Sequence, residues 1–595
     1  TKRLIEVEEV VWVPMENGKI YDGNLYVKRS DNPSLNFPDG VNGIYATITA
    51  ALADLNFRGV GGATRFLLND ATYPSETFPL TVNVQNESMP TAANTVTIKP
   101  NVGVTALIQG TAAASQIFLI KNSYVTLDGS NAPAGTTKDL TIENLSTSTP
   151  QVIRIGSTGT TPLTNTTIKN CNVINGVNTS TAITVYGADG TAGYFNSITI
   201  QNNDIQKAYH GLYILAIMTG TNGSGTLVTN NTINSAVNPI SGTAVYVQGV
   251  NSVMVSNNTI ANITHGTLTT SSTGVWFATG TFNGTISGNN ITNLSYTGTS
   301  SYAPRGIAVT SGYIDNYTII NNVISGVTSS GTSAPYGINA GGAGGLTIAN
   351  NSISGLLNSH ASGYGARGLY LSTGVNSSDI NVYNNLIYNV QATSDASSTY
   401  WVLGIAIDGA TGGANIYYNT VNLYGTYAGY ASATLSSAFC VMNSGANAIE
   451  VGNNIFVNTY DNSAGVGDKS YSIYSVAPNT GFTNINYNDY YASGAPAILG
   501  NINESSVQTD KTTLPDWRTA TGKDAYSVSG NPGFTSYVNF IPDGTNANSW
   551  TVYNNGTHIA GITTDYAGNP RPLTVPAGTP DMGAYEFGQP SVNPT

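Results

Sequence analysis

The sequence predicts an all-β fold, a right-handed parallel β-helix in which the chain coils into a column of stacked turns. Three observations predict it: a short motif recurs along most of the chain, apolar residues alternate within each copy, and only 9% of residues are charged. The repeat is the strongest of the three, because a period of about 20 to 50 residues is typical of solenoid proteins.

The recurring motif is a pair of asparagines flanked by aliphatic residues. Clear copies are Ile200-Gln-Asn-Asn203-Asp-Ile205 and Ile319-Ile-Asn-Asn322-Val-Ile324, and the second asparagine of each copy follows the previous one by 27 to 35 residues. Asparagine tolerates left-handed backbone, and stacked amides can bond one another from turn to turn. We therefore expect a structural ladder made of Asn203, Asn231, Asn258, Asn289, Asn322, Asn351, Asn385, Asn419, Asn454 and Asn488.

A second motif, a glycine followed by a short apolar run, gives each repeat another strand. Examples are Gly306-Ile-Ala-Val309 and Gly368-Leu-Tyr-Leu371. Alternate apolar positions place one row of side chains on one face of a strand. A single repeat cannot bury that row, whereas stacked repeats can. A β-propeller is the alternative, but its four-stranded blades repeat at about 40 residues or more, so the β-helix is favoured.

The expected organisation has three parts: an N-terminal extension over residues 1–40, the β-helix over 41–500 and an irregular capping region over 501–595. Residues 44–55 predict an amphipathic helix that covers the N-terminal end of the core, since an open sheet edge invites aggregation. A strand is expected over residues 4–13. It either packs on its own column or adds to a neighbouring subunit. Its assembly residues would be Leu4, Ile5, Val7, Val10, Val11, Trp12 and Val13.

Both ends of the chain carry a family resemblance. The runs from Gly61 to Tyr73, Asn531 to Phe534, Asp565 to Pro572 and Pro580 to Phe587 resemble secreted bacterial right-handed parallel β-helix repeat proteins of the pectate-lyase-like superfamily. The resemblance covers about residues 40 to 590. It implies the fold and leaves the activity open, because this fold hosts lyases, hydrolases, adhesins and fibres.

Charge and hydropathy exclude several partners. The net charge is −12 with only 20 Lys and Arg, so nucleic acid and anionic membrane are poor partners. No apolar run approaches the ~18 residues of a transmembrane segment. Cys171 and Cys440 fall many repeats apart, too far for a disulfide, and are expected to be buried thiols.

Candidate catalytic residues are few. The 97 residues from Ala208 to Pro304 contain no Asp, Glu, Lys or Arg. Polysaccharide hydrolysis needs two nearby carboxylates, so only two clusters merit attention. The first contains Asp204, Lys207 and His210, with Asp189 and Arg154 near them in sequence. The second contains Arg367 and Asp408, with Asp379 and Asp395. The alternative for both is a set of turn-capping aspartates and solvated cations. We expect no cofactor and no metal, since no ligand spacing typical of a metal site occurs.

Carbohydrate is a candidate ligand of this chain. Tyr417, Tyr418 and Tyr424 belong to a tyrosine-rich stretch that would stack on sugar rings if exposed, although tyrosines also pack within sheets. Asn-x-Ser/Thr triplets occur, for example, at Asn222, Asn283, Asn316 and Asn376, and they would allow a glycoprotein. Their number is near the chance expectation for a chain so rich in Asn, Ser and Thr.

These features together predict an extracellular or cell-surface structural protein rather than an enzyme. We expect a subunit of a fibre or filament that binds copies of itself head-to-tail. A chain that begins at Thr1 without Met fits a processed exported protein as well as a shortened one. The alternatives are a carbohydrate-binding adhesin and a polysaccharide lyase or glycoside hydrolase.

Overall fold

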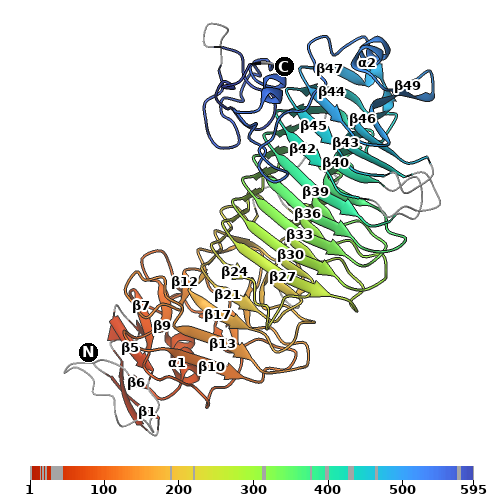
Figure 1. The fold of residues 1–595 in the computed structure, drawn as a ribbon. Coiled ribbons are helices and arrows are strands. Elements are labelled where there is room, and N and C mark those ends of the chain that lie inside the picture. Colours follow the sequence, from red (N-terminus) through yellow and green to blue (C-terminus); the bar gives the residue numbers. More distant parts are fainter. Residues whose placement is uncertain are drawn as a thin grey trace. The chain divides into compact units, whose positions relative to one another are not determined.

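The computed structural model is a parallel β-helix, which confirms the predicted fold class (Figure 1). It describes residues 3–593 except 8, 14, 17–18, 21–22, 28–43, 188–189, 219–221, 311–315, 375–377, 395–400, 427–433, 463–466 and 573–577, with side chains described from Tyr45 onward. The chain forms two compact units. The first is Thr1–Ile263 with Gly280–Gly284, and the second is Thr264–Thr279 with Thr285–Thr595.

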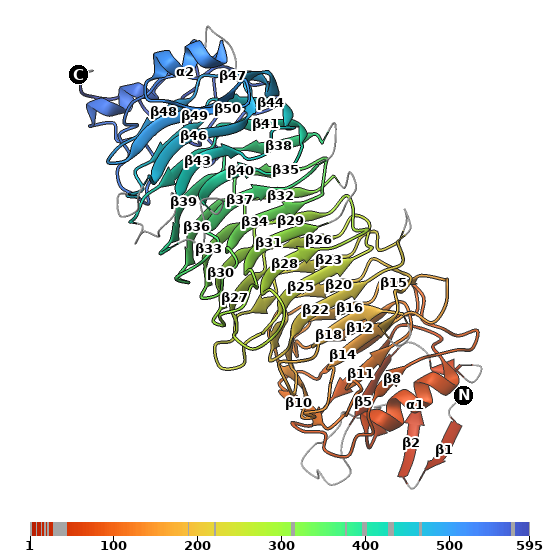
Figure 2. The same cartoon turned by 90° about the vertical axis from the view of Figure 1, so that its right-hand side faces the viewer.

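Each turn of the helix, here called a rung, supplies one strand to each of three parallel sheets, named I, II and III in chain order (Figure 2). In the first unit, sheet I has β6 (Ile44–Tyr45), β5 (Gly23–Val27), β7 (Thr64–Leu68), β9 (Val96–Pro100), β12 (Val125–Asp128), β16 (Thr167–Lys169), β20 (Thr199–Gln201), β23 (Leu227–Thr229) and β26 (Met254–Ser256). Sheet II has β10 (Ala106–Gly110), β13 (Leu140–Asn144), β17 (Cys171–Ile174), β21 (Asp204–Gln206), β24 (Thr232–Ile233) and β27 (Thr259–His265). Sheet III has β8 (Leu80–Val82), β11 (Phe118–Ile120), β14 (Ile153–Gly156), β18 (Ile183–Tyr186), β22 (His210–Leu215) and β25 (Thr243–Gln248). A short extra pair joins β15 (Leu163–Thr164) and β19 (Phe195–Asn196).

The second unit repeats the pattern. Sheet I has β29 (Thr285–Ser287), β32 (Thr318–Ile320), β35 (Thr347–Ala349), β38 (Ile380–Tyr383), β41 (Gly412–Tyr417), β44 (Asn447–Gly452) and β47 (Phe482–Asn486). Sheet II has β30 (Asn290–Tyr296), β33 (Val323–Ser329), β36 (Ser352–Asn358), β39 (Leu386–Ala392), β42 (Thr420–Leu423), β45 (Ile455–Asn458) and β48 (Asp489–Ala492). Sheet III has β28 (Thr273–Phe277), β31 (Arg305–Thr310), β34 (Tyr336–Gly341), β37 (Ala366–Leu371), β40 (Val402–Ile407), β43 (Leu435–Val441), β46 (Lys469–Pro478), β49 (Ala497–Glu504) and the antiparallel β50 (Val507–Lys511).

The core consists of aliphatic columns between the sheets. In sheet I, Ile319 pairs with Ile348, which pairs with Val382, and all three are fully buried. Residues on either side of these positions face outward, as a period of two requires. The alternation read from the sequence therefore sets which side of every strand is buried.

The asparagine ladder is present at the rung corner between sheets I and II. The Nδ2 of Asn322 donates to the Oδ1 of Asn351 at 3.0 Å, and that of Asn351 donates to Asn385 at 3.0 Å. Each Oδ1 also accepts the backbone N–H of the preceding ladder residue, and each Nδ2 also reaches a backbone carbonyl, as from Asn351 to Ile319 at 2.9 Å. The same bonds join Asn203 to Asn231 and Asn231 to Asn258 in the first unit. They continue in the second unit to Asn419, Asn454 and Asn488.

The two asparagines of each motif have different roles. The first has left-handed backbone, with φ of +57° at Asn321 and +54° at Asn350. The second is the buried ladder residue. The turn and the ladder, which the sequence assigned to one recurring asparagine, are thus divided between neighbours.

Helix α1 (Ile48–Arg58) covers one end of the first unit's core with Ile48, Ala51, Leu52 and Leu55. It begins four residues later than the sequence predicted, because the Thr47 side chain caps it at the N–H of Ala50. Asn56 of α1 also closes the edge of β8. Its amide donates to Thr81 O at 2.8 Å and accepts from Asn83 N at 2.7 Å, as a neighbouring strand would.

The C-terminal region is more than an end cap. Helix α2 (Leu514–Thr521) places Trp517, fully buried, beside Tyr490. Backbone bonds from residues 524–528 close the edges of β47 and β48. Short 3₁₀ turns lie at Asn479–Gly481 and Ala547–Thr551. The described residues between 553 and 587 are here called the C-terminal strap. The strap lies against earlier rungs of the second unit.

The N-terminal segment differs from the prediction. The expected single strand over residues 4–13 is a hairpin of β1 (Arg3–Val7) and β2 (Glu9–Val13), with Leu4 paired to Trp12 and Ile5 to Val11. β3 (Met15–Glu16) and β4 (Lys19–Ile20) form another small pair. β5 lies within the range assigned to the extension, yet it pairs in parallel with β7 in sheet I. The side chains of the predicted assembly residues lie outside the described part.

Candidate functional site

The second predicted cluster is partly assembled on the outer face of sheet III in the second unit. Arg367 on β37 pairs in register with Tyr336 on β34. Its guanidinium carbon lies 4.4 Å from the ring centre of Tyr370, and its Nη1 donates to the Tyr336 hydroxyl at 2.7 Å. The Tyr370 hydroxyl in turn donates to Asp408. Arg367 and Asp408 are therefore linked through one tyrosine, so the structure brings these two residues of the predicted cluster together.

The other two members are not part of this cluster. Asp379 precedes β38 in sheet I at a residue with φ of +47°, and Asp395 lies outside the described residues. A glycosidase mechanism needs a second carboxylate close to Asp408. None of the described residues of this predicted cluster supplies one.

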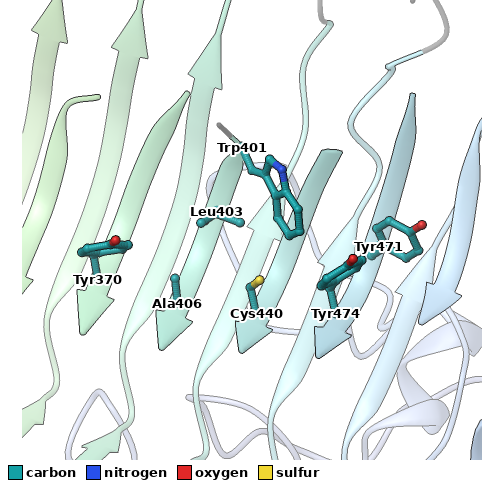
Figure 3. Packing of buried hydrophobic residues seen from close by; sticks show 7 residues of the cluster. All are labelled: Tyr370, Trp401, Leu403, Ala406, Cys440, Tyr471 and Tyr474. Carbon is teal, nitrogen blue, oxygen red and sulfur yellow. The ribbon is translucent and has the colours of Figure 1, made fainter. Parts of the chain in front are cut away.

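Further aromatic residues cluster with Tyr370 on the same face (Figure 3). The Trp401 and Tyr474 rings meet edge-on with centroids 4.7 Å apart, and Tyr471 lies 5.2 Å from Tyr474. Leu403, Ala406 and Cys440 form a fully buried floor. The cluster is thus a small second core outside the column, where the sequence predicted solvated charge.

Burial controls the protonation of this cluster. It raises the pKa of Asp408, an effect that the positive charge of Arg367 opposes. It raises the pKa of the Cys440 thiol well above its ordinary value, and that of Tyr474 to about 12. The thiol is therefore neutral at physiological pH and unsuited to act as a nucleophile.

The first predicted cluster is not assembled. Asp204 on sheet II accepts a hydrogen bond from Gln206 at 3.0 Å, whereas His210 belongs to sheet III. Lys207 is the corner residue between them, with φ of +56°. His210 packs among Tyr209, Tyr213 and Tyr246.

Burial lowers the pKa of His210 to about 4. The ring is neutral near pH 7, and no ion pair among the described residues joins it to Asp204. Asp189 lies outside the described part. Arg154 stacks over Tyr186 at 4.5 Å instead of approaching the cluster.

The predicted glycan-contacting tyrosines have three different environments. Tyr418 is 1% exposed under Arg571, whose guanidinium carbon lies 3.8 Å from its ring centre. Its hydroxyl donates to Thr557 O at 2.6 Å, so the expectation of an exposed ring is wrong at this position. Tyr417 is half-buried and bonds Glu450. Tyr424 is half-buried beside Tyr537, with ring centres 4.9 Å apart.

The Asn-x-Ser/Thr triplet at Asn222 is not available for glycosylation in this fold. Asn222 is 2% exposed, and its amide accepts from Phe195 N at 2.9 Å and donates to Gly193 O at 2.8 Å. A side chain held in this way cannot carry a bulky glycan. Asn283 and Asn316 are exposed, and Asn376 lies outside the described part.

Sequence reasoning missed a groove beside Tyr424 in the second unit. It has a volume of about 400 Å³ and lies between sheet II and residues 531–537. Its eleven lining residues carry no charge, and include Asn422, Tyr491 and Tyr537. The clue in the sequence was weak, because one wall comes from three successive rungs between Asn422 and Ser493 and the other from an irregular segment that begins at Asn531.

A stack of charges on sheet I of the first unit was missed as well. Asp128 lies between Lys99, at 3.9 Å, and Lys169, at 3.3 Å, on the outer face of β9, β12 and β16. All three residues directly follow a buried aliphatic position of their strand, so alignment of the repeats would have placed them in one column.

Neither a metal centre nor a membrane span is found in the described part of the chain. No group of three or more His, Cys, Asp or Glu side chains there could hold a metal ion. No helix there is long and apolar enough to cross a bilayer. Cys171 and Cys440 are both free and buried.

Comparison with known proteins gives structural similarities alone. No family model and no curated protein matches the sequence. The Dettilon tailspike protein is 12% identical with a TM-score of 0.31, covering 77% of this chain and 70% of its own. The A-module of the Azotobacter vinelandii mannuronan C-5 epimerase AlgE6 is 12% identical with a TM-score of 0.32, covering 82% and 94%. PfbA, a surface adhesin of Streptococcus pneumoniae, is 13% identical with a TM-score of 0.26, covering 81% and 95%.

Proposed function

We propose that this protein is a non-catalytic structural protein of the cell exterior that assembles head-to-tail into fibres. The observation that carries the proposal is the unequal treatment of the strand edges at the ends of the two units. At the edge of β8, Asn56 replaces a strand; at β10, residues 71–73 do so; and at β47 and β48, residues 524–528 do so. β50, the last strand of sheet III, has β49 on one side and no strand on the other among the described residues.

The N-terminal hairpin supplies a matching element. β1 and β2 form a two-stranded sheet of their own and belong to none of the three sheets. β2 contacts β6 of its own chain but forms a ladder with β1 alone. A two-stranded hairpin is at best marginally stable in water, and it gains stability by adding to an open edge. We infer that the hairpin of one copy pairs with β50 of the next copy. Because donor and acceptor differ, the contact does not close on itself, and repetition makes a filament.

The environment of the candidate catalytic residues supports the non-catalytic part of the proposal. Arg367 is 9% exposed and held between two tyrosines, and His210 packs among three tyrosine rings. Both side chains are placed where packing, rather than access to a polymer substrate, explains them.

Electron microscopy of the full-length protein tests the assembly. We expect regular fibres from the intact chain and single molecules from a variant that lacks residues 1–16. A control variant, Tyr526→Ala, changes an exposed residue outside the hairpin and β50 and should still form fibres.

Proline scanning of β50 tests the acceptor. Neighbouring residues of a strand point their N–H groups to opposite sides, so either Gln508→Pro or Thr509→Pro removes an outward donor while β49 pairing persists. The proline variant that keeps the wild-type melting temperature should not form fibres and should remain monomeric. Fibres formed without the hairpin, or single molecules from the intact protein at every concentration, would overturn the proposal.

A further inference from the structure

We propose that the groove between sheet II and residues 531–537 is a binding site for a neutral saccharide. This goes beyond fibre formation and does not depend on it. The groove lies entirely within the second unit, and its volume of about 400 Å³ falls in the range of small-ligand sites.

The floor of the groove comes from successive rungs. Asn422 on β42 pairs in register with Val457 on β45, which pairs with Tyr491 on β48. Thr459 and Ser493 follow the last two strands. Neighbouring strands lie about 4.8 Å apart, so these side chains follow one another at a regular spacing. Asn422 is only 2% exposed, and the half-buried groups of the floor are the hydroxyls of Thr459 and Ser493 and the ring of Tyr491.

The opposite wall is held in place before any ligand arrives. Gly530 N donates to Asp489 Oδ1 at 3.0 Å, and Asp543 N donates to Gly533 O at 2.7 Å. Phe534 meets Phe540 edge-on at 5.4 Å, and Phe540 lies 4.7 Å from Tyr388 of sheet II. A preformed wall lowers the entropy cost of binding.

Tyr537 is the feature that points to a ligand. Its side chain is 63% exposed at the rim of the groove, next to Tyr424. Val538 and Ile541 nearby are 64% and 41% exposed. A large exposed ring beside a concave polar surface is typical of a binding residue, since its apolar face gains from being covered.

The lining selects the class of ligand. No lining residue is charged, so a charged ligand would lose hydration without finding a counter-charge. A purely apolar ligand would leave the amides and hydroxyls without partners. A neutral saccharide avoids both costs. Its C–H faces stack on aromatic rings, and its hydroxyls bond amides and hydroxyls.

A glycan array with neutral and acidic members tests the site, with affinities then measured by calorimetry. We expect retention of at least one neutral glycan and a loss of about tenfold or more in affinity for Tyr537→Ala. Tyr526→Ala is the matched control. Tyr526 is 64% exposed, stacks on Tyr487 and does not line the groove, so its variant should bind as the wild type does.

A second variant guards against loss of folding. Ser493→Trp places a large side chain in the groove and should abolish binding, while circular dichroism and the melting temperature stay close to those of the wild type. Selection of acidic glycans only, retention of no glycan, or equal affinity in Tyr537→Ala and the wild type would each refute the site.

Discussion

At the scale of single residues, each buried amide of the ladder makes several hydrogen bonds, as Asn351 shows. Asn351 is fully buried. Its Oδ1 accepts two bonds from Asn322, and its Nδ2 donates to Asn385 and to Ile319 O. Its left-handed neighbour Asn350 fulfils a backbone requirement that glycine meets equally well.

Substitution of the two asparagines should separate these roles. Asn351→Ala leaves two donors and two acceptors without their partner in a buried position, and each costs about 1–3 kcal/mol. We expect a loss of several kcal/mol in the free energy of unfolding, measured by guanidinium denaturation. Asn350→Gly should change stability by less than about 1 kcal/mol. An equal loss of unfolding free energy in Asn351→Ala and Asn350→Gly would show that the ladder bonds do not distinguish the two asparagines.

At the scale of elements, the C-terminal strap joins distant rungs through a buried ionic cluster. Arg571, 3% exposed, bonds Glu586, Asn384 and Gly583 O and stacks on Tyr418. Asp565 and Asp581 are buried next to it. The strap therefore places three carboxyl groups around one cation.

Protonation of Asp581 should stabilise the packing of the C-terminal strap against the earlier rungs. Burial, and next the charge of Glu586, raise the pKa of Asp581 from 3.8 to about 7; two backbone N–H donors and Arg571 act in the opposite direction. The folded state then binds a proton more tightly than the unfolded state, so its stability is greatest below about pH 4 for this group and falls as the pH rises to 7. The full loss is about 4 kcal/mol. Burial raises the pKa of Glu586 as well, which acts in the same direction.

Hydrogen exchange measures this effect directly. After correction for intrinsic rates, amides of residues 553–572 should be better protected at pH 5 than at pH 8. Asp581→Asn should remove most of the difference, while Asp543→Asn, at a surface turn bonded to Thr545, should leave it unchanged. Equal corrected protection at both pH values in the wild type would contradict the assignment.

At the scale of the whole molecule, each rung depends on its immediate neighbours, as in other solenoids. β32 pairs with β35 at Ile319 and Ile348, and β35 pairs with β38 at Ile348 and Val382. Removal of one complete rung should therefore bring equivalent positions into register again.

Deletion of residues 322–350 tests this independence. The ladder would close from Asn289 to Asn351, and β32 would pair with β38. We expect the circular dichroism spectrum of the wild type and a cooperative transition at a similar melting temperature. Deletion of residues 322–335, about half a rung, sends the following strands to the wrong sheets and should unfold the second unit. A similar loss of structure in both deletions would exclude neighbour-only stabilisation.

The sequence by itself determined the features that repeat. The alternating aliphatic positions, the ladder asparagines and the covering helix near residue 48 all follow from local spacing, because each rung meets a copy of the same pattern. The sequence also grouped Arg367 with Asp408 as one candidate cluster, although their burial among aromatic rings did not follow from it.

Only the tertiary structure decided the features that do not repeat. The strap buries Tyr418, 139 residues away from its partner Thr557 in sequence, and residues 531–537 build one wall of the groove on rungs formed far earlier in the chain. Asp204 and His210 are close in sequence, yet the corner at Lys207 sends them to different sheets. Contacts of this kind have no period, and their energy depends on which surfaces the finished column presents. A local pattern therefore cannot specify them.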